Sequence, residues 1–394
     1  MTFAADSACS ALPVSREPGA TYYNGATYYS QGAPGELWNM LMHHQATYDH
    51  NVDAVVGPAC SGASNAAAYF AEEFKVPMVS YSATSKSLSG RSPYFFRLSA
   101  PDSEKSLRIV DFMADVDWTH VGIISTDTAY GKGMADNIKS DWLAHDSESK
   151  VEYRQIIDVD RDDVADKVEE AMSLLDQGSS DAVTRVVVLT GHTNDVGEML
   201  FHIADADVGG TVDSTAYVLT TDSVPLPENI GKPGWPENMR DGIFACVIAE
   251  PDTSTSGTMA YDYLQTWKTQ ASGYLGRNPN DTDGSPDTIH TYGWNTHDAV
   301  VVVARAYHEL VNGGGSGTLR DKIDELTPEM GVSGQVEIDR HTHDRKDSRF
   351  DLMNLQGGQW VKVATISPGL VQPVRKTLQL CFSFAMPLSG PEKS

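Results

Sequence analysis

Residues Val52–Thr84 read VDAVVGPACSGASNAAAYFAEEFKVPMVSYSAT, and this stretch decides the fold because it holds two short strands with a helix between them. Val52–Val56 is an apolar run closed by a Gly-Pro turn. From Ser61 onward apolar residues recur at helical spacing, and Val76–Tyr81 is a second apolar run. The pattern predicts a strand that feeds the start of a helix, followed by a second buried strand.

Small hydroxyl residues follow both predicted strands. Ser61 stands at the predicted helix start, and Ser82 and Thr84 follow the second strand. The carboxyl edge of a parallel sheet is where ligands bind in open α/β folds, and a helix start offers backbone N–H groups and positive dipole. We therefore predict a cradle for a carboxylate at this edge. The alternative is that these residues are helix caps and turn residues, positions that Ser and Thr favour.

Strands and helices alternate regularly after His120, which indicates a parallel sheet covered by helices on both faces. This second sheet, added to the one begun by Val52–Tyr81, predicts an α/β protein of two lobes. The predicted strands are residues 121–125, 152–158, 185–190 and 216–221, and the predicted helices are 133–145, 163–175 and 196–205.

The composition limits the classes of partner that this chain is expected to bind. The 394 residues suffice for two cores, and the net charge of -25 repels phosphate backbones and anionic membrane surfaces, so nucleic acid is not an expected partner. No apolar run is long enough to span a bilayer, and Met1–Leu12 lacks the features of a secretory signal.

The chain resembles the ligand-binding region shared by natriuretic-peptide receptors, class C G-protein-coupled receptors and bacterial amino-acid-binding proteins, which has the type I periplasmic-binding fold. Beyond Val52–Thr84, the resemblance rests on PYFFRLSAPDS (Pro93–Ser103), DWTHVGIISTDTAYGKG (Asp117–Gly133), SGQVEID and FDLMNLQGG. It implies a two-lobed, Venus-flytrap architecture in which each lobe is a parallel sheet flanked by helices and the chain crosses three times. The implied divisions are residues 1–99 and 247–330 for lobe one, 100–246 and 331–366 for lobe two, and 367–394 as a tail of unknown structure.

The resemblance also implies a ligand site. By analogy with amino-acid-binding members, one group of residues would hold the carboxylate of the ligand and another its amino group. The carboxylate group is Ser61, Ser82, Ala83 and Thr84, and the amine group is Asp102, Tyr130 and Asp222. Glutamate-sensing relatives hold a distal carboxylate with basic residues, but the matching positions here are Pro227 and Tyr292. We therefore favour a neutral or aromatic amino acid as ligand.

The resemblance pairs Cys9 with Cys60 in a disulfide, which would imply an oxidising compartment; two unpaired buried thiols are the alternative. Cys246 lies in an apolar run and is expected in the core, and Asn280 begins the one glycosylation sequon. In the relatives an opening strand and helix precede the region that contains Cys9. We expect these and a signal peptide upstream, so that the chain resembles a fragment lacking its front.

The sequence supports an enzyme or a metal-binding site less well than it supports a ligand-binding protein. The chain lacks G-x-G-x-x-G, P-loop, G-x-S-x-G and H-E-x-x-H motifs, and no cofactor is expected. An acidic run imitates a calcium loop, but Asp163 stands where Gly must make the turn, so we expect a helix cap. We expect a solvated turn at HTHDRKDSR and no ligand cluster at His43-His44. The residues weighed as metal ligands are Asp158, Asp160, Asp162, Glu169, His341, His343 and Asp344.

The resemblance thus implies an extracellular receptor module, attached to a membrane through segments beyond this chain. It would bind a small amino-acid-like ligand between its lobes, signal by closing, and form a homodimer through lobe one. Three alternatives remain open: a soluble solute-binding protein for amino-acid transport, a natriuretic-type ectodomain, linked to a guanylate cyclase, that senses a peptide, and an enzyme on this scaffold, which would turn over its bound ligand.

Overall fold

The computed structural model describes residues 52–116, 118, 120–146, 150–158, 163–178, 185–205, 216–221, 243–275, 289, 291–313, 316–346, 348–356, 359–367 and 370–373. The chain divides into two compact units. Unit 1 is Met1–Pro101 with Glu250–Ser348, and unit 2 is Asp102–Ala249 with Arg349–Ser394. Each unit is described by itself.

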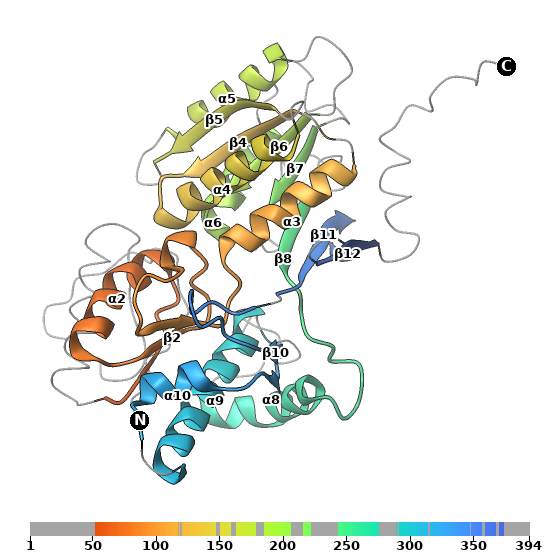
Figure 1. The fold of residues 1–394 in the computed structure, drawn as a ribbon. Helices are drawn as coiled ribbons and strands as arrows, with labels where there is room; N and C mark the ends of the chain where they lie inside the picture. Colours follow the sequence, from red (N-terminus) through yellow and green to blue (C-terminus); the bar gives the residue numbers. More distant parts are fainter. Residues whose placement is uncertain are drawn as a thin grey trace, which may run out of the picture. The chain divides into compact units, whose positions relative to one another are not determined.

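Unit 1 is built on three parallel strands in the order β1-β2-β3 (Figure 1). The strands are β1 (Val55–Val56), β2 (Met78–Ser80) and β3 (Phe95–Arg97), and helix α2 (Ser61–Phe74) connects β1 to β2. The remaining elements are η1 (Lys86–Leu88), α8 (Met259–Leu275), α9 (Thr291–Asn312), α10 (Leu319–Glu325), β9 (Glu329–Gly331) and β10 (Gly334–Val336).

Alternate residues of these strands pack against different helices. Met78 and Phe95 lie in one cluster with the buried alanines of α2, whereas Val79 and Phe96 lie in another with α9 residues such as Val302. Successive strand side chains point to opposite faces of a sheet. The short sheet is therefore covered on both faces, as the sequence predicts, and its carboxyl edge is left for the loops that follow β1 and β2.

Unit 2 contains an eight-stranded mixed sheet in the order β13-β12-β11-β8-β7-β6-β4-β5. The parallel part is β4 (His120–Thr126), β5 (Lys150–Ile157), β6 (Arg185–Thr190), β7 (Ala216–Thr220) and β8 (Ile243–Ile248). The antiparallel part is β11 (Phe350–Gln356), β12 (Gln359–Ser367) and β13 (Leu370–Pro373). The helices are α3 (Asp102–Asp115), α4 (Ala129–His145), α5 (Val164–Gly178) and α6 (Thr193–Asp205).

The sequence analysis and the structure divide the end of the chain differently. Residues 331–348 belong to unit 1, whereas the sequence-based division places 331–366 in lobe two. The physical reason is Arg345, which is 8% exposed and donates hydrogen bonds to the Leu98 carbonyl, the Asn295 side chain and the Gln335 carbonyl. Strand β13 also extends the sheet of unit 2 into the segment that the sequence analysis leaves as a tail.

Candidate ligand-binding site

Two loops meet at the carboxyl edge of the unit 1 sheet. Ser61, the first residue of α2, accepts a hydrogen bond from the backbone N–H of Ser85 at 3.0 Å. Ser82 donates from its hydroxyl to the Ala59 carbonyl at 2.9 Å. These contacts join the loop after β1 to the loop after β2, so the structure brings together the residues that the sequence assigns to a carboxylate cradle. We call residues 61 and 82–85 the cradle.

The hydrogen bonds of the cradle determine which donors remain for a ligand. The Ser82 hydroxyl proton is used by Ala59, and the Ala83 N–H is used by Ser80 Oγ at 3.1 Å. Ser61 acts as an acceptor, so its proton remains to be donated. Among the residues described, the Thr84 hydroxyl has no hydrogen-bond partner, and both residues are almost fully buried. No described hydrogen bond uses the hydroxyl protons of Ser61 and Thr84, whereas the Ser85 hydroxyl is paired with Ser87 Oγ at 3.0 Å.

The start of α2 adds backbone donors to the cradle. Cys60 is the N-cap residue, and its side chain makes no capping hydrogen bond. The first N–H groups of a helix have no partner within the helix, and the positive end of the helix dipole lies beside them. An anion at this position would therefore gain both hydrogen bonds and a favourable field.

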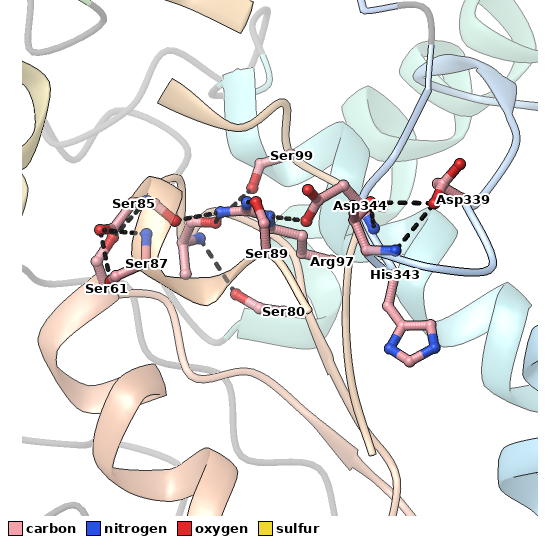
Figure 2. Close-up of polar contacts among 12 residues, drawn as sticks. Ser61, Ser80, Ser85, Ser87, Ser89, Arg97, Ser99, Asp339, His343 and Asp344 are labelled. Carbon is pink, nitrogen blue, oxygen red and sulfur yellow. Dashed lines mark hydrogen bonds and ion pairs between the residues drawn. The ribbon is translucent and has the colours of Figure 1, made fainter. Parts of the chain in front are cut away.

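A fully buried arginine lies behind the cradle. Arg97, the last residue of β3, donates from Nη1 to the carbonyl oxygens of Ser85 at 2.8 Å and Ala83 at 3.2 Å. Its Nε donates to Asp344 Oδ1 at 2.6 Å. Figure 2 shows the resulting line of contacts from Ser61 through Ser85 to Arg97 and Asp344. Sequence reasoning missed Arg97 as a site residue; the available signal was a lone basic residue at the end of a buried aromatic strand.

The expectation of a solvated turn at HTHDRKDSR is wrong for its centre. His343, Asp344 and Arg345 are buried, while His341 is exposed. The cause is the fold of unit 1, in which Arg97 pairs with Asp344 and the ring of Phe96 packs on that of His343 at 4.6 Å. No group of three His, Cys, Asp or Glu side chains that could hold a metal occurs in the described part of the chain.

His343 has a shifted pKa. Burial is the largest cause and lowers the pKa of His343 below 6.5; the neighbouring Arg320 lowers it further, while Asp324, the Ser92 carbonyl and Asp344 partly offset the shift. Its Nε2 lies 3.3 Å from Arg320 Nη2 and 3.7 Å from Asp324 Oδ1. The neutral ring is therefore favoured in the folded protein.

Asp298 of α9 holds the turn between β9 and β10. Its carboxylate accepts the N–H groups of Val332 and Ser333, both at 2.9 Å, and contacts His297 Nδ1 at 3.1 Å. Burial raises the pKa of Asp298, but hydrogen bonds from His297, Ser333 and Val332 together outweigh it and lower the pKa. Tyr292, the position where glutamate-sensing relatives carry a basic residue, lies in the first turn of the same helix.

At the carboxyl edge of the unit 2 sheet, Tyr130 is held between two strand ends. Its hydroxyl lies 2.7 Å from Thr221 Oγ1, and its ring packs on that of His192 with centroids 5.3 Å apart. Gly131 and Gly191 let the adjacent backbone approach the end of β4, because a Cβ on either would lie within 2.6 Å of the Thr126 side chain. The structure thus puts Tyr130 beside the residue that precedes Asp222.

Asp102 has a cation close by in its own helix. It is the first residue of α3, fully buried, and its Oδ1 lies 3.7 Å from Lys105 Nζ. An ammonium ligand would compete with Lys105 for this carboxylate. The assignment of Asp102 to the amine of a ligand stays a prediction, and this pair weakens it.

Several predicted residues lie outside the described residues. They are Cys9, His43, His44, Asp160, Asp162, Asp222, Pro227 and Asn280. The disulfide between Cys9 and Cys60 and the glycan on Asn280 therefore stay predictions. Cys246 is fully buried, which confirms its expected place in the core.

Comparisons with known proteins identify the family of this chain. Residues 21–358 match the family described as the receptor family ligand-binding region. The chain is similar to the metabotropic glutamate receptor-like protein E of Dictyostelium discoideum, with 39% identity over 89 residues, which are 22% of this chain and 11% of that protein. The chain belongs to the receptor family ligand-binding region, and it spans a small part of the length of this curated relative.

Solved structures show the same fold. The leucine-binding protein LivK of Thermotoga maritima superposes with a TM-score of 0.67 at 18% identity, over 87% of both chains. A solute-binding protein of an ABC transporter from Rhodopseudomonas palustris, in complex with p-hydroxybenzoic acid, gives 0.66 at 16% identity, over 90% of this chain and 88% of that one. The fold is therefore the two-lobed type I periplasmic-binding fold that the sequence predicts. The described part of the chain holds no helix long and apolar enough to cross a membrane.

Proposed function

We propose that this chain binds a small carboxylate ligand of amino-acid type, without chemical change, and that the cradle of unit 1 holds its carboxylate. The observation that carries the proposal is that Ser61, at the start of α2 where the N-cap side chain makes no capping hydrogen bond, is joined through the Ser85 N–H to the loop that carries Thr84. Leucine and p-hydroxybenzoic acid, the compounds associated with the two structural neighbours named above, share a carboxylate and differ in the rest. The carboxylate is thus the part of the ligand with the strongest support.

Unit 2 would supply the contacts to the amino group. Tyr130 offers its ring face and hydroxyl, and Asp222 follows Thr221 directly in the sequence. A carboxylate and an aromatic face both stabilise an ammonium group. Closure of the two units over a ligand would follow from its extra affinity for the closed arrangement. A neutral or aromatic side chain fits the proposal better than glutamate, since Pro227 and Tyr292 provide no positive charge.

The biological setting is the extracellular part of a longer membrane receptor, with no catalytic role. This proposal is supported by the receptor relative, of which the matched segment is a small part. A soluble binding protein that serves a transporter is the competing setting, because both structural neighbours named above are binding proteins. A full-length transcript decides between them: the receptor requires an encoded membrane span and the transport protein does not.

A thermal-shift screen tests the binding function. The panel comprises the common amino acids, 4-aminobutyrate, benzoates and small dicarboxylates, each with the wild-type chain and the Asp222→Ala variant. A ligand at 100 times its dissociation constant stabilises the folded state by about 2.7 kcal/mol. We expect at least one amino acid to raise the melting temperature of the wild type and to lose most of this effect in the variant. A folded chain that responds to no carboxylate contradicts the proposal.

A further inference from the structure

The buried guanidinium of Arg97 has a defined relation to the peptide groups of the cradle. Its Nη1 donates to the carbonyls of both Ala83 and Ser85, its Nη2 donates to Ser89 Oγ at 2.7 Å, and Ser99 donates a second hydrogen bond to the Ala83 carbonyl at 3.0 Å. The side chain is 0% exposed. Arg97 therefore does not contact a ligand directly. Instead, it fixes the cradle backbone, which would contact the ligand.

The backbone geometry of Thr84 follows from these contacts. In a trans peptide the C=O of one residue and the N–H of the next point in opposite directions. Because Arg97 and Ser99 hold the Ala83 carbonyl on their side, the N–H of Thr84 points to the other side, away from Arg97. The next peptide group is fixed as well, since Ser61 Oγ accepts the Ser85 N–H. Both peptide groups that flank Thr84 are thus set by buried contacts.

We propose that Arg97 is a positioning residue for carboxylate recognition: by holding the Ala83 and Ser85 carbonyls, it aims the N–H and hydroxyl of Thr84 at the carboxylate of the ligand. This inference rests on the proposed function. Asp344 holds the guanidinium of Arg97 in place by accepting a hydrogen bond from its Nε, and the carboxylate compensates the positive charge. Preorganised donors of this kind need no rearrangement when the charged group arrives.

Arg345 provides a matched control for Arg97. It is also a buried arginine of unit 1 with several hydrogen bonds, but its described acceptors are Leu98, Asn295, Ser333 and Gln335, none of which belongs to the cradle. A general loss of stability would affect ligand binding in both arginine variants alike. A positioning role predicts that carboxylate recognition changes in the Arg97 variant and not in the Arg345 variant.

The experiment measures how strongly the chain prefers a carboxylate to the matching carboxamide. Dissociation constants are determined by calorimetry for three acid and amide pairs: L-leucine and L-leucinamide, L-phenylalanine and L-phenylalaninamide, and 4-hydroxybenzoate and 4-hydroxybenzamide. The proteins are the wild type, Arg97→Met, Arg345→Met and Ser99→Ala. Ser99→Ala removes one hydrogen bond to the Ala83 carbonyl and leaves the Arg97–Asp344 pair, so the test does not depend on the folding of Arg97→Met.

We expect Arg97→Met to lower the preference for the acid about tenfold or more, and Ser99→Ala to lower it about threefold, while Arg345→Met keeps the wild-type ratio. If the ratio of the amide and acid dissociation constants is the same in the wild type, Arg97→Met and Ser99→Ala, the positioning role is overturned and the proposed function is left intact. A wild-type chain that binds none of the six compounds would overturn the proposed function, and this inference with it.

Discussion

The cradle of unit 1 and the Tyr130 edge of unit 2 occupy equivalent places in their sheets, yet they are built differently. Ser61 and Ser85 are joined by a buried hydrogen bond and backed by the Arg97–Asp344 pair. Tyr130, in the residues described, is held by one hydroxyl contact with Thr221 and by the ring of His192. A buried polar network rigidifies its members. The cradle is therefore backed by a buried ion pair, whereas the described contacts of the Tyr130 side chain are a hydroxyl contact and a ring contact.

The largest expected loss of stability comes from breaking the ion pair between Arg97 and Asp344. Arg97→Met leaves Asp344 without its buried partner, and breaking such a pair costs about 3–5 kcal/mol. Urea unfolding of the variant measures the loss. A double variant, Arg97→Met with Asp344→Leu, removes both charges and should recover much of the stability. A cost below about 1 kcal/mol for the single variant would contradict the buried network.

The next effect concerns the hydrogen bond that joins the two loops of the cradle. Ser61→Ala leaves the buried N–H of Ser85 without an acceptor, which costs about 1–3 kcal/mol. Ser87→Ala is the matched control, because Ser87 is an exposed serine of the same loop and should change stability by less than about 0.5 kcal/mol. Equal costs for the two variants would show that the Ser61–Ser85 contact does not stabilise the cradle.

A smaller effect is expected at the unit 2 edge. Tyr130→Phe removes the hydroxyl contact with Thr221 and should cost about 0.5–1.5 kcal/mol. A double-mutant cycle with Thr221→Val isolates this contact. The comparison requires Tyr130→Phe to lower the free energy of unfolding by less than Ser61→Ala does. The reverse order would contradict the comparison.

The smallest effect is a pH dependence of unit 1. The pKa of His343 is lowered in the folded state, so the unfolded chain binds its proton first as pH falls below about 6.5. Stability contributed by the neutral ring is present above that pH and is lost as the pH falls through the folded pKa. His343→Asn keeps a residue suited to the left-handed backbone at φ 59° and should reduce the pH dependence of the melting temperature below about pH 6.5. An unchanged slope in this variant would contradict the assignment.

The sequence predicted the elements whose patterns are local. The alternation after His120 located β4 to β7 and their helices within a few residues, because each element buries a periodic apolar face. It also located Ser61 at the start of α2, because small hydroxyl residues at the ends of strands mark the functional edge of such a sheet.

The buried polar contacts could not be predicted in the same way. Asp344 lies 247 residues after Arg97 and sits in a charged segment whose composition is typical of a solvated turn. The pairing arises from tertiary packing, which brings 331–348 into unit 1 and so moves the last division of the chain from the expected position. A pattern confined to neighbouring residues carries no information about such a partner.

The most direct test of the central claim is a crystal structure of the chain with the amino acid that gives the largest thermal shift. The account predicts that the ligand carboxylate lies within hydrogen-bond distance of the Ser61 and Thr84 hydroxyls, with its negative charge facing the start of α2. A ligand whose carboxylate binds elsewhere, with the cradle filled by water, would contradict the account.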